Sequence, residues 1–310
     1  MTTAASDSDV QAAADALRAG TLVAFPTETV YGLGALITDE AAIRRIYDVK
    51  SRPRSQALLA HVSGVPMART LVEDWPERAD ALARQFWPGP LTMVLRKSPH
   101  APDIATGGGT TIGLRCPDHD VALRLIDAVG DAIAGTSANR SGEPSPVTPE
   151  QVRRAFEPDV VHVLDAGRAP GGLESTVLLL GDSERDDRIL RPGPIGAAAL
   201  GLDSSQTLTG SQEQRDQAIV RLVSDEDLNQ INVPNGSVLI THHTPAPRFD
   251  GACVQLPPEA EAYSREMYDA IHRATASRSD RGWILVVEPQ EAGEVWDAIR
   301  QRLNRLSGKN

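Results

Sequence analysis

Polar side chains of the kind that bind nucleotides and small polar substrates gather in five stretches of the sequence. In the first, residues 25–34, Thr27 and Thr29 follow a short apolar segment and precede two glycines. Hydroxyls and free backbone amides in a loop at the end of a strand can hold a small polar ligand. Threonines that cap a tight turn leave the same pattern, so this stretch alone does not decide between the two.

The second stretch is a run of cations, interrupted by one acid, Asp48. Its members are Arg44, Arg45, Lys50, Arg52 and Arg54. Arginine offers a fork of donors to phosphate oxygens, and lysine offers a compact charge. The whole chain has a net charge of −11, so this local excess favours a polyphosphate site, although a solvated helix face carries similar runs.

The third stretch, residues 107–117, is a glycine-rich loop that feeds a strand ending in Arg115. It lacks the Lys-Ser/Thr of a phosphate-binding loop, and no G-x-G-x-x-G opens a helix after a strand. Both the common nucleoside triphosphatases and the dinucleotide-binding fold are therefore disfavoured. Arg115 suits either a bidentate carboxylate contact or a surface salt bridge.

The last two stretches complete a set of hydroxyls, amides and cations. Residues 135–145 are dense in Ser, Thr and Asn, which suits a phosphate or a ribose but also a turn-rich connection, and they hold no general base. Residues 172–177 and 189–193 belong together, because Ser175 opens one expected strand and Arg191 closes the next. Arg191 adds a cation to the expected phosphate site.

The elements that must position these side chains alternate between helix and strand, which indicates an α/β fold. We expect helices at 8–19, 39–49, 77–86 and 119–129 and another starting at Thr148-Pro149 with a capping box closed by Gln151, and strands at 21–25, 57–61, 91–95, 111–115, 132–134, 160–164, 175–180 and 188–190. A polar tract follows at 203–216. Beyond it we expect helices at 216–224, 259–275 and 292–306 and strands at 237–241, 253–256 and 283–287.

Composition bounds the class of protein. The 310 residues are 41% hydrophobic and 24% charged, an ordinary globular balance that favours two domains. We divide the chain into a catalytic domain (1–202), a linker (203–235) and a small α/β domain (236–310). No apolar run approaches the ~20 residues of a membrane span, and the first ten residues are polar and acidic, so we expect neither a membrane segment nor a secretory signal.

The two cysteines, Cys116 and Cys253, are too few for a disulfide scaffold or a cysteine zinc site. Two lone cysteines suit a reducing compartment, so we expect both to be packed side chains in a cytoplasmic protein. The net charge of −11 argues against a protein that coats nucleic acid non-specifically.

Together the five stretches resemble the YrdC-type threonylcarbamoyl-AMP synthases. The matching elements occur in family order: Pro26–Gly32, Lys50-x-Arg52-Pro53, Trp87–Thr92, Thr111-x-x-x-Arg115-x-Pro117, Ser137-Ala-Asn139, Ser141-Gly142, Pro144-Ser145, Glu174–Thr176 and Arg191–Gly193. The tail, with Leu256-Pro-Pro and Tyr263–Tyr268, resembles the long two-domain (Sua-type) members more loosely. The resemblance implies a YrdC-like twisted mixed sheet with flanking helices and a concave active face, then a small Rossmann-like α/β domain.

The resemblance also implies an activity. Such enzymes are nucleotidyltransferases that make L-threonylcarbamoyladenylate and pyrophosphate from ATP, L-threonine and bicarbonate, the first step of the threonylcarbamoyladenosine (t6A) modification of tRNA. By position, threonine contacts are implied for Thr29, His61, Arg115, Gly135 and Ser175. ATP contacts are implied for Lys50, Arg52, Gln56, Thr111, Ser137, Asn139, Ser145 and Arg191, with Lys50 and Arg52 also catalytic. Mg²⁺ would arrive with ATP, and no residue is assigned as a metal ligand.

A downstream tRNA threonylcarbamoyl transferase is the implied partner, and RNA, either tRNA or double-stranded RNA, is a further candidate. Two stretches depart from the family pattern. Gln56-Ala-Leu58 replaces Asn-Pro-Leu, and the linker lacks the usual tyrosine motif, because no tyrosine lies between Tyr47 and Tyr263.

Two other functions stay open at this point. One is an RNA-binding module of the same fold, against which the negative charge and the aromatic content of 4% argue. The other is a relative that adenylates carbamoyl phosphate for hydrogenase maturation. Dependence on threonine separates that relative from the synthase.

Overall fold

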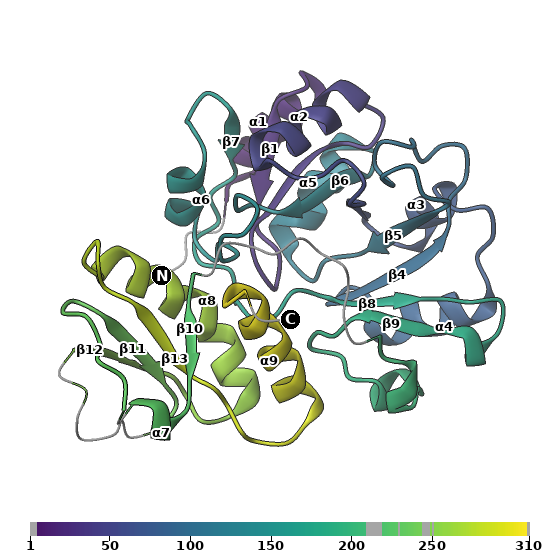
Figure 1. Cartoon of the computed structure of the whole chain (residues 1–310). Coiled ribbons are helices and arrows are strands. Elements are labelled where there is room, and N and C mark those ends of the chain that lie inside the picture. The colour runs from purple at the N-terminus through teal and green to yellow at the C-terminus, as the bar shows by residue number, and fades with distance from the viewer. Residues whose placement is uncertain (1–4, 209–218, 229, 244–248, 250, 309–310) are drawn as a thin grey trace. The chain divides into compact units, whose positions relative to one another are not determined.

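The computed structural model describes residues 5–208, 219–228, 230–243, 249 and 251–308. Contacts divide the chain into two compact units (Figure 1). Unit 1 comprises Met1–Ser141, Ser145–Pro170 and Glu174–Ser211, and unit 2 comprises Gly142–Pro144, Gly171–Leu173 and Gln212–Asn310. The central part of the expected linker, 209–218, lies outside the described residues.

Unit 1 is built on one mixed sheet of nine strands, in the order β7-β1-β2-β6-β3-β5-β4-β8-β9 (Figure 1). The strands are β1 (Leu22–Phe25), β2 (Gly32–Leu36), β3 (Leu59–His61), β4 (Leu91–Arg96), β5 (Thr111–Arg115), β6 (Ile133–Ser137), β7 (Val161–Val163), β8 (Thr176–Leu179) and β9 (Arg188–Arg191). The pairs β1–β7, β3–β5 and β4–β8 are parallel and the other pairs are antiparallel. This confirms the twisted mixed sheet with flanking helices that the resemblance implied.

Helices cover both faces of this sheet. They are α1 (Asp7–Arg18), α2 (Glu40–Lys50), α3 (Val65–Thr70), α4 (Glu77–Phe86), α5 (Asp120–Val129) and α6 (Pro149–Ala155). One core joins α1 and α5 to Val23, Phe25 and Ile133, and a second core joins α2 to Leu22 and Ala24. Since successive residues of a strand point to opposite faces, the two cores lie on opposite sides of the sheet. The expected capping box of Thr148 and Gln151 begins α6.

The strand β2 was not expected from the sequence, because two glycines and a proline favour a loop over residues 26–34. The turn instead ends early, and β2 pairs with β1 in a register that sets Gly32 opposite Phe25. The glycines are needed for packing within the sheet, since a Cβ on Gly34 would lie 2.4 Å from Cγ2 of Ile133 and 3.0 Å from the Phe25 ring. The prediction that this whole segment is a loop was therefore wrong.

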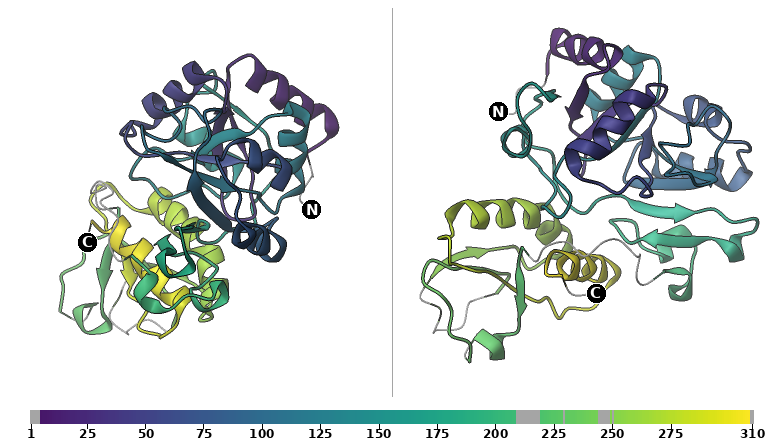
Figure 2. Two further views of the ribbon diagram at one scale, coloured as in Figure 1. Left: turned by 90° about the vertical axis from the view of Figure 1, so that its right-hand side faces the viewer. Right: turned by 45° about the horizontal axis from the view of Figure 1, so that its top comes forward.

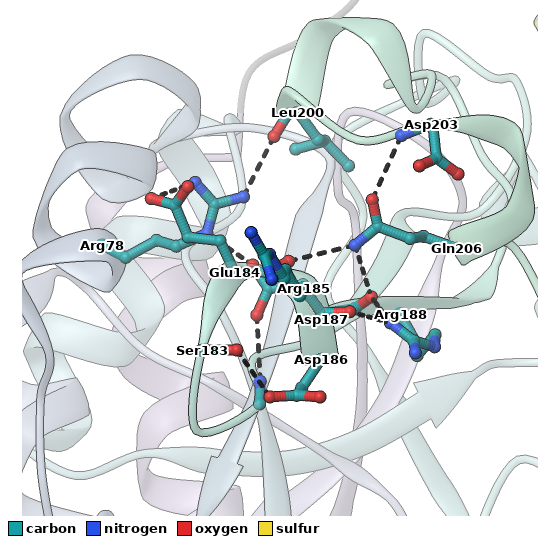
Figure 3. Close-up of polar contacts among 11 residues, drawn as sticks. Arg78, Ser183, Glu184, Arg185, Asp186, Asp187, Arg188, Leu200, Asp203 and Gln206 are labelled. Atoms are coloured by element: carbon teal, nitrogen blue, oxygen red, sulfur yellow. Dashed lines mark hydrogen bonds and ion pairs between the residues drawn. The ribbon is translucent and has the colours of Figure 1, made fainter.

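A polar cluster anchors the β8–β9 hairpin to helix α4 (Figure 3). The carboxylate of Asp187 is buried, accepts a hydrogen bond from Nε of Arg78, and accepts a second from the backbone N–H of Gly181 at 2.9 Å. Arg78 Nη2 also donates to the carbonyl oxygen of Leu200 at 3.1 Å. Three short 3-10 turns surround the cluster: Glu184–Asp186, Ala198–Leu200 and Ser204–Gln206.

The segment that follows these turns pairs with the edge strand of the sheet. Gln206 Nε2 donates to the carbonyl oxygens of Glu184 and Asp187, and Leu208 N–H donates to that of Ile189. Residues 203–208, which the sequence analysis assigned to the linker, are therefore bonded to β9 and the turn before it.

Unit 2 contains a parallel four-stranded sheet in the order β10-β13-β11-β12, with its helices beside it (Figures 1 and 2). Its strands are β10 (Arg221–Val223), β11 (Val238–Thr241), β12 (Ala252–Gln255) and β13 (Ile284–Val287), and its helices are α7 (Asp225–Leu228), α8 (Ala260–Ser277) and α9 (Glu294–Leu306). This is the small Rossmann-like domain that the resemblance implied.

Two expectations for unit 2 were wrong. The helix expected at 216–224 is replaced at 221–223 by strand β10, while 216–218 lie outside the described residues. Short apolar runs rich in β-branched residues, as here with Ile219, Val220 and Val223, suit a buried strand better than a helix. Cys253 is exposed on β12 rather than packed, whereas Cys116 is buried as expected. None of the helices in the described ranges is long and apolar enough to cross a membrane.

Candidate active site

The register of three adjacent strands places five of the predicted site residues on one face of the large sheet. His61 of β3 pairs with Arg115 of β5 and with Ile133 of β6. Since paired residues share a face and alternate residues return to it, Thr111, Gly135 and Ser137 lie on the same face. Helices α1 and α5 pack against Ile133 on this face. These five strand residues therefore share the face that carries this core.

The predicted threonine contacts centre on Arg115, whose side chain is buried. Its Nη2 donates to Thr29 Oγ1 at 2.9 Å and lies 2.9 Å from Oε2 of Glu28. Within the described part of the chain, its Nε has no hydrogen-bond partner. Thr29 Oγ1 lies 2.9 Å from Thr27 Oγ1, and Thr27 in turn donates to the Val30 carbonyl, so the turn after β1 holds its hydroxyls toward the arginine. A guanidinium with a free N–H is suited to a substrate carboxylate.

His61 lies beside this arginine and is fully enclosed. Its Nδ1–H donates to the Ile133 carbonyl oxygen at 3.3 Å, and its ring packs edge-on against Phe25 with centroids 5.2 Å apart. Burial, together with the neighbouring Arg115 charge, lowers the pKa of His61 to about 3. The imidazole is therefore neutral at physiological pH and suits hydrogen bonding better than proton transfer.

Gly135 faces His61 across the β3–β6 pair. A Cβ at this position would lie 2.9 Å from the Leu33 carbonyl oxygen and 3.3 Å from Cε1 of His61. The space is too small for a methyl group, so glycine lets the backbone of β6 approach the histidine. A contact of Gly135 with threonine, which stays a prediction, would therefore be made by its backbone.

Three of the predicted ATP residues meet where α2 ends and β6 ends. The Lys50 side chain is buried, and its ammonium donates to the Ser137 carbonyl oxygen at 2.6 Å and to the Asn139 carbonyl oxygen. Ser137 Oγ also donates to Oδ1 of Asn139. A buried cation here fixes the loop after β6 and supplies positive charge to the surface beside it.

Arg191 and Ser175 join the predicted ATP and threonine contacts directly. Arg191 donates to the Ser175 carbonyl oxygen from Nε at 3.1 Å and from Nη2 at 2.8 Å, and Nη2 lies 3.0 Å from Ser175 Oγ. Ser175 Oγ also lies 2.8 Å from Thr92 Oγ1. Met93 of β4 pairs with Leu114 of β5 in antiparallel register. The residue before Met93, Thr92, therefore lies opposite Arg115.

The remaining predicted residues lie further from this centre. Thr111 begins β5, so it is about 13 Å from Arg115 along the strand at ~3.3 Å per residue. Arg52 donates to the carbonyl oxygens of Gln56 and Ala57, so residue 56 contacts it through the main chain. Ser145 Oγ donates to Oε1 of Glu174 at 2.8 Å. Whether these residues contact ATP stays a prediction.

Three polar residues of the site were not singled out from the sequence: Glu28, Thr92 and Glu174. Each lies inside a motif that the sequence analysis quoted, so the signal was present. Their roles come from contacts between motifs that are far apart in the chain, such as Thr92 with Ser175. Residue types and spacing within one motif do not reveal such contacts.

No group of three or more His, Cys, Asp or Glu side chains is placed to hold a metal ion within the described part of the chain.

Comparison with known proteins decides the family. A model for Sua5, YciO and YrdC proteins, described as "Telomere recombination", matches residues 15–193, more than half of the chain. The chain belongs to the Sua5/YciO/YrdC family. All of the predicted site residues fall within this match, since they lie between Thr29 and Arg191.

Relatives in this family carry a common name. A threonylcarbamoyl-AMP synthase of Pyrococcus abyssi is 45% identical over 184 residues, which cover 59% of this chain and 54% of the relative. One of Bacillus subtilis is 41% identical over 191 residues, covering 61% and 54%. These alignments span about half the length of the two relatives.

A solved family structure extends the likeness to both units. The crystal structure of P. abyssi Sua5 complexed with L-threonine matches with a TM-score of 0.82 at 31% identity, covering 98% of this chain and 95% of that one. The two-domain Sua-type form that the tail suggested is therefore confirmed.

Proposed function

We propose that this member of the Sua5/YciO/YrdC family is an L-threonylcarbamoyladenylate synthase, a nucleotidyltransferase that supplies the first intermediate of tRNA t6A modification. Its substrates would be ATP, L-threonine and bicarbonate. The names of the relatives and the threonine complex of P. abyssi Sua5 support this proposal.

The observation that carries the proposal is the direct contact between Arg191, a predicted ATP contact, and Ser175, a predicted threonine contact. On one side lie Arg115 and Thr29, which match the carboxylate and hydroxyl of threonine. On the other side lies Lys50 with the β6 loop, which suits phosphate oxygens. A reaction that joins an amino acid to a nucleotide needs this adjacency.

The proposed chemistry needs positioning and positive charge. The threonine amine attacks bicarbonate to form a carbamate, whose oxygen attacks the α-phosphorus of ATP, and pyrophosphate leaves. Arg115 holds the threonine carboxylate, and His61 orients the substrate as a neutral hydrogen-bonding group. Lys50, Arg52 and Arg191 stabilise charge on the phosphoryl oxygens. Mg²⁺ bound to ATP would neutralise the remaining phosphate charge.

Release of pyrophosphate from ATP, measured with and without L-threonine and bicarbonate, tests the proposal. We expect release that requires both, with a product of threonylcarbamoyl-adenylate mass. Release that instead requires carbamoyl phosphate would indicate the hydrogenase-maturation chemistry. Retention of RNA without ATP turnover would indicate the binding module.

The wider setting is part of the same proposal. We propose that residues 1–202 form the catalytic domain, and that the unstable adenylate passes to a tRNA threonylcarbamoyl transferase. The protein would work in the cytoplasm, where ATP, threonine and tRNA are available. RNA, whether tRNA or a double-stranded segment, remains a candidate partner that gel-shift titration can test.

A further inference from the structure

Glu28 is a buried carboxylate beside the predicted threonine contacts, and its hydrogen-bonding capacity is unused. Its side chain is 14% exposed, and neither Oε1 nor Oε2 has a hydrogen-bond partner among the residues that the structure describes. Oε2 lies 2.9 Å from Nη2 of Arg115 without hydrogen-bond geometry. A buried carboxylate normally accepts several hydrogen bonds, so an unsatisfied one in a substrate site points to a missing donor.

Arg115 has the complementary property. Its Nη2 donates to Thr29, but its buried Nε has no acceptor in the described ranges. The pair therefore presents a spare N–H donor and spare carboxylate oxygens within a few ångströms of each other. A ligand that carries both a carboxylate and an ammonium on one carbon satisfies both at once.

We propose that Glu28 binds the α-ammonium group of L-threonine and accepts the proton that this group must lose before its nitrogen can attack. The inference rests on the proposed function. It adds the residue that recognises the amino group, beside Arg115 for the carboxylate and Thr29 for the hydroxyl.

The proton and bond changes balance. The ammonium gives one proton to the Glu28 carboxylate, which leaves a neutral amine with a lone pair. The amine nitrogen forms a bond to the bicarbonate carbon while the C–OH bond breaks, and the second nitrogen proton leaves with the hydroxyl as water. The products are the carbamate, one water and protonated Glu28, which then returns its proton to solvent.

The neighbouring groups are poorly suited to this step. His61 donates its Nδ1–H to a backbone carbonyl and is hemmed in by Phe25 and Gly135. Burial raises the pKa of Cys116 to about 12, with the Glu28 charge adding to the effect, so the thiol stays protonated. Burial lowers the pKa of His119, although Glu28 opposes that shift, so this imidazole is uncharged and cannot pair with an ammonium as an anion can.

Binding of two ligands separates recognition of the ammonium from positioning of Arg115. L-Threonine carries carboxylate, hydroxyl and ammonium, whereas (R)-3-hydroxybutyrate lacks only the ammonium. Each is titrated into the wild-type chain and into Glu28→Gln by calorimetry. We expect the substitution to weaken L-threonine binding by about tenfold to a hundredfold, as for loss of a charge-assisted hydrogen bond. Binding of the analogue should stay unchanged or tighten, because Arg115 loses its competing anion.

Equal weakening of both ligands by Glu28→Gln would overturn the inference, since Glu28 would then act only by ordering Arg115. Glu40→Gln is the matched control, because Glu40 forms an exposed ion pair with Arg44 at 2.8 Å and should alter neither affinity. A wild-type chain that binds no threonine and releases no pyrophosphate would overturn the proposed function and the inference together.

The pH dependence of turnover tests the proton step. With Glu28→Gln, the rate should rise about tenfold per pH unit while free amine is scarce, because solution now supplies the deprotonated substrate. The wild-type rate should rise less steeply. Glu28→Asp, which keeps the charge, should retain the preference for L-threonine over the analogue with a reduced kcat. It is the alternative variant for this test if Glu28→Gln does not fold. A Glu28→Asp variant without that preference, or a Glu28→Gln profile that parallels the wild type, would contradict the proposal.

Discussion

Arg191 donates to both the carbonyl oxygen and the hydroxyl of Ser175, across the antiparallel β8–β9 pair. One residue is a predicted ATP contact and the other a predicted threonine contact. Since the guanidinium orients the serine, occupancy of one subsite affects the geometry of the other. The two substrates are therefore expected to bind cooperatively.

Arg191→Ala should weaken ATP binding and also remove the cooperativity. In the wild-type chain, a saturating concentration of a non-hydrolysable ATP analogue is expected to lower the Kd of L-threonine by about fivefold or more. In the variant the two ligands should bind independently, which calorimetric titration of each in the presence of the other will measure. Arg188→Ala, on the same strand, is the control, because Arg188 bonds only to nearby turn carbonyls among its described contacts. Unchanged coupling in Arg191→Ala would show that Ser175 is held without it.

Lys50 and Arg52 should differ when each is replaced by alanine. Lys50→Ala leaves the buried Asn139 carbonyl oxygen and the part-buried Ser137 carbonyl oxygen without their ammonium donor, which should lower the free energy of unfolding by about 1–3 kcal/mol. Arg52 lies nearer to solvent and bonds to loop carbonyls, so Arg52→Ala should abolish pyrophosphate release with a smaller loss of stability. Urea unfolding alongside the activity assay distinguishes them. Full activity in both variants would refute the predicted ATP site.

His61 should make the protein less stable in mild acid. Its pKa is lowered from 6.5 to about 3 in the folded state. Between pH 6.5 and about 3, His61 is protonated in the unfolded chain and neutral in the folded chain, so the free energy of unfolding falls as the pH falls. One such group contributes about 1.4 kcal/mol per pH unit. Urea unfolding at pH 6 and pH 5 should therefore show a larger loss for the wild type than for His61→Gln, and equal losses would contradict this assignment.

Asp187 should be a major contributor to the stability of unit 1. Its buried carboxylate pairs with Arg78, which is 24% exposed on its side chain, so Asp187→Ala should cost about 2–4 kcal/mol. Asp186→Ala removes only an exposed contact with Ser183 and serves as the control. A double-mutant cycle with Arg78→Ala measures the pair, and a coupling energy near zero would show that the cluster in Figure 3 acts through its other bonds.

Much of unit 1 could be predicted because its elements follow local rules. Strand β5 lies at 111–115 as expected, and the capping box that starts α6 was predicted from Thr148 and Gln151. Strand β2 was missed because Gly32 and Gly34 look like loop residues until the Phe25 ring that covers them is known. Strand β10 was missed because residues 216–224 were assigned to a helix, although the β-branched residues at 219, 220 and 223 favour a strand.

The site could be assembled from the sequence only as a set of motifs. Arg115, Thr29 and Ser175 were identified as candidates, but the contacts of Arg115 with Thr29 and of Ser175 with Arg191 and Thr92 join segments that lie far apart in the chain. The unused capacity of Glu28 is visible only once Arg115 is seen beside it at 2.9 Å, because an acid in a turn is usually solvated. The residue types predicted which groups could bind the substrates, and the pairing of the strands determines which of these groups contact one another.

Strand β5 carries Thr111 at its start and Arg115 at its end, on the same face of the sheet. Under the proposed assignment these residues hold opposite ends of the adenylate, so the length of the strand sets the distance between the two contacts with the product. Inserting one residue between them would turn one side chain to the far face, and inserting two would restore the face but lengthen the span by ~7 Å. Natural variation in this segment should therefore change residue types and leave its length untouched.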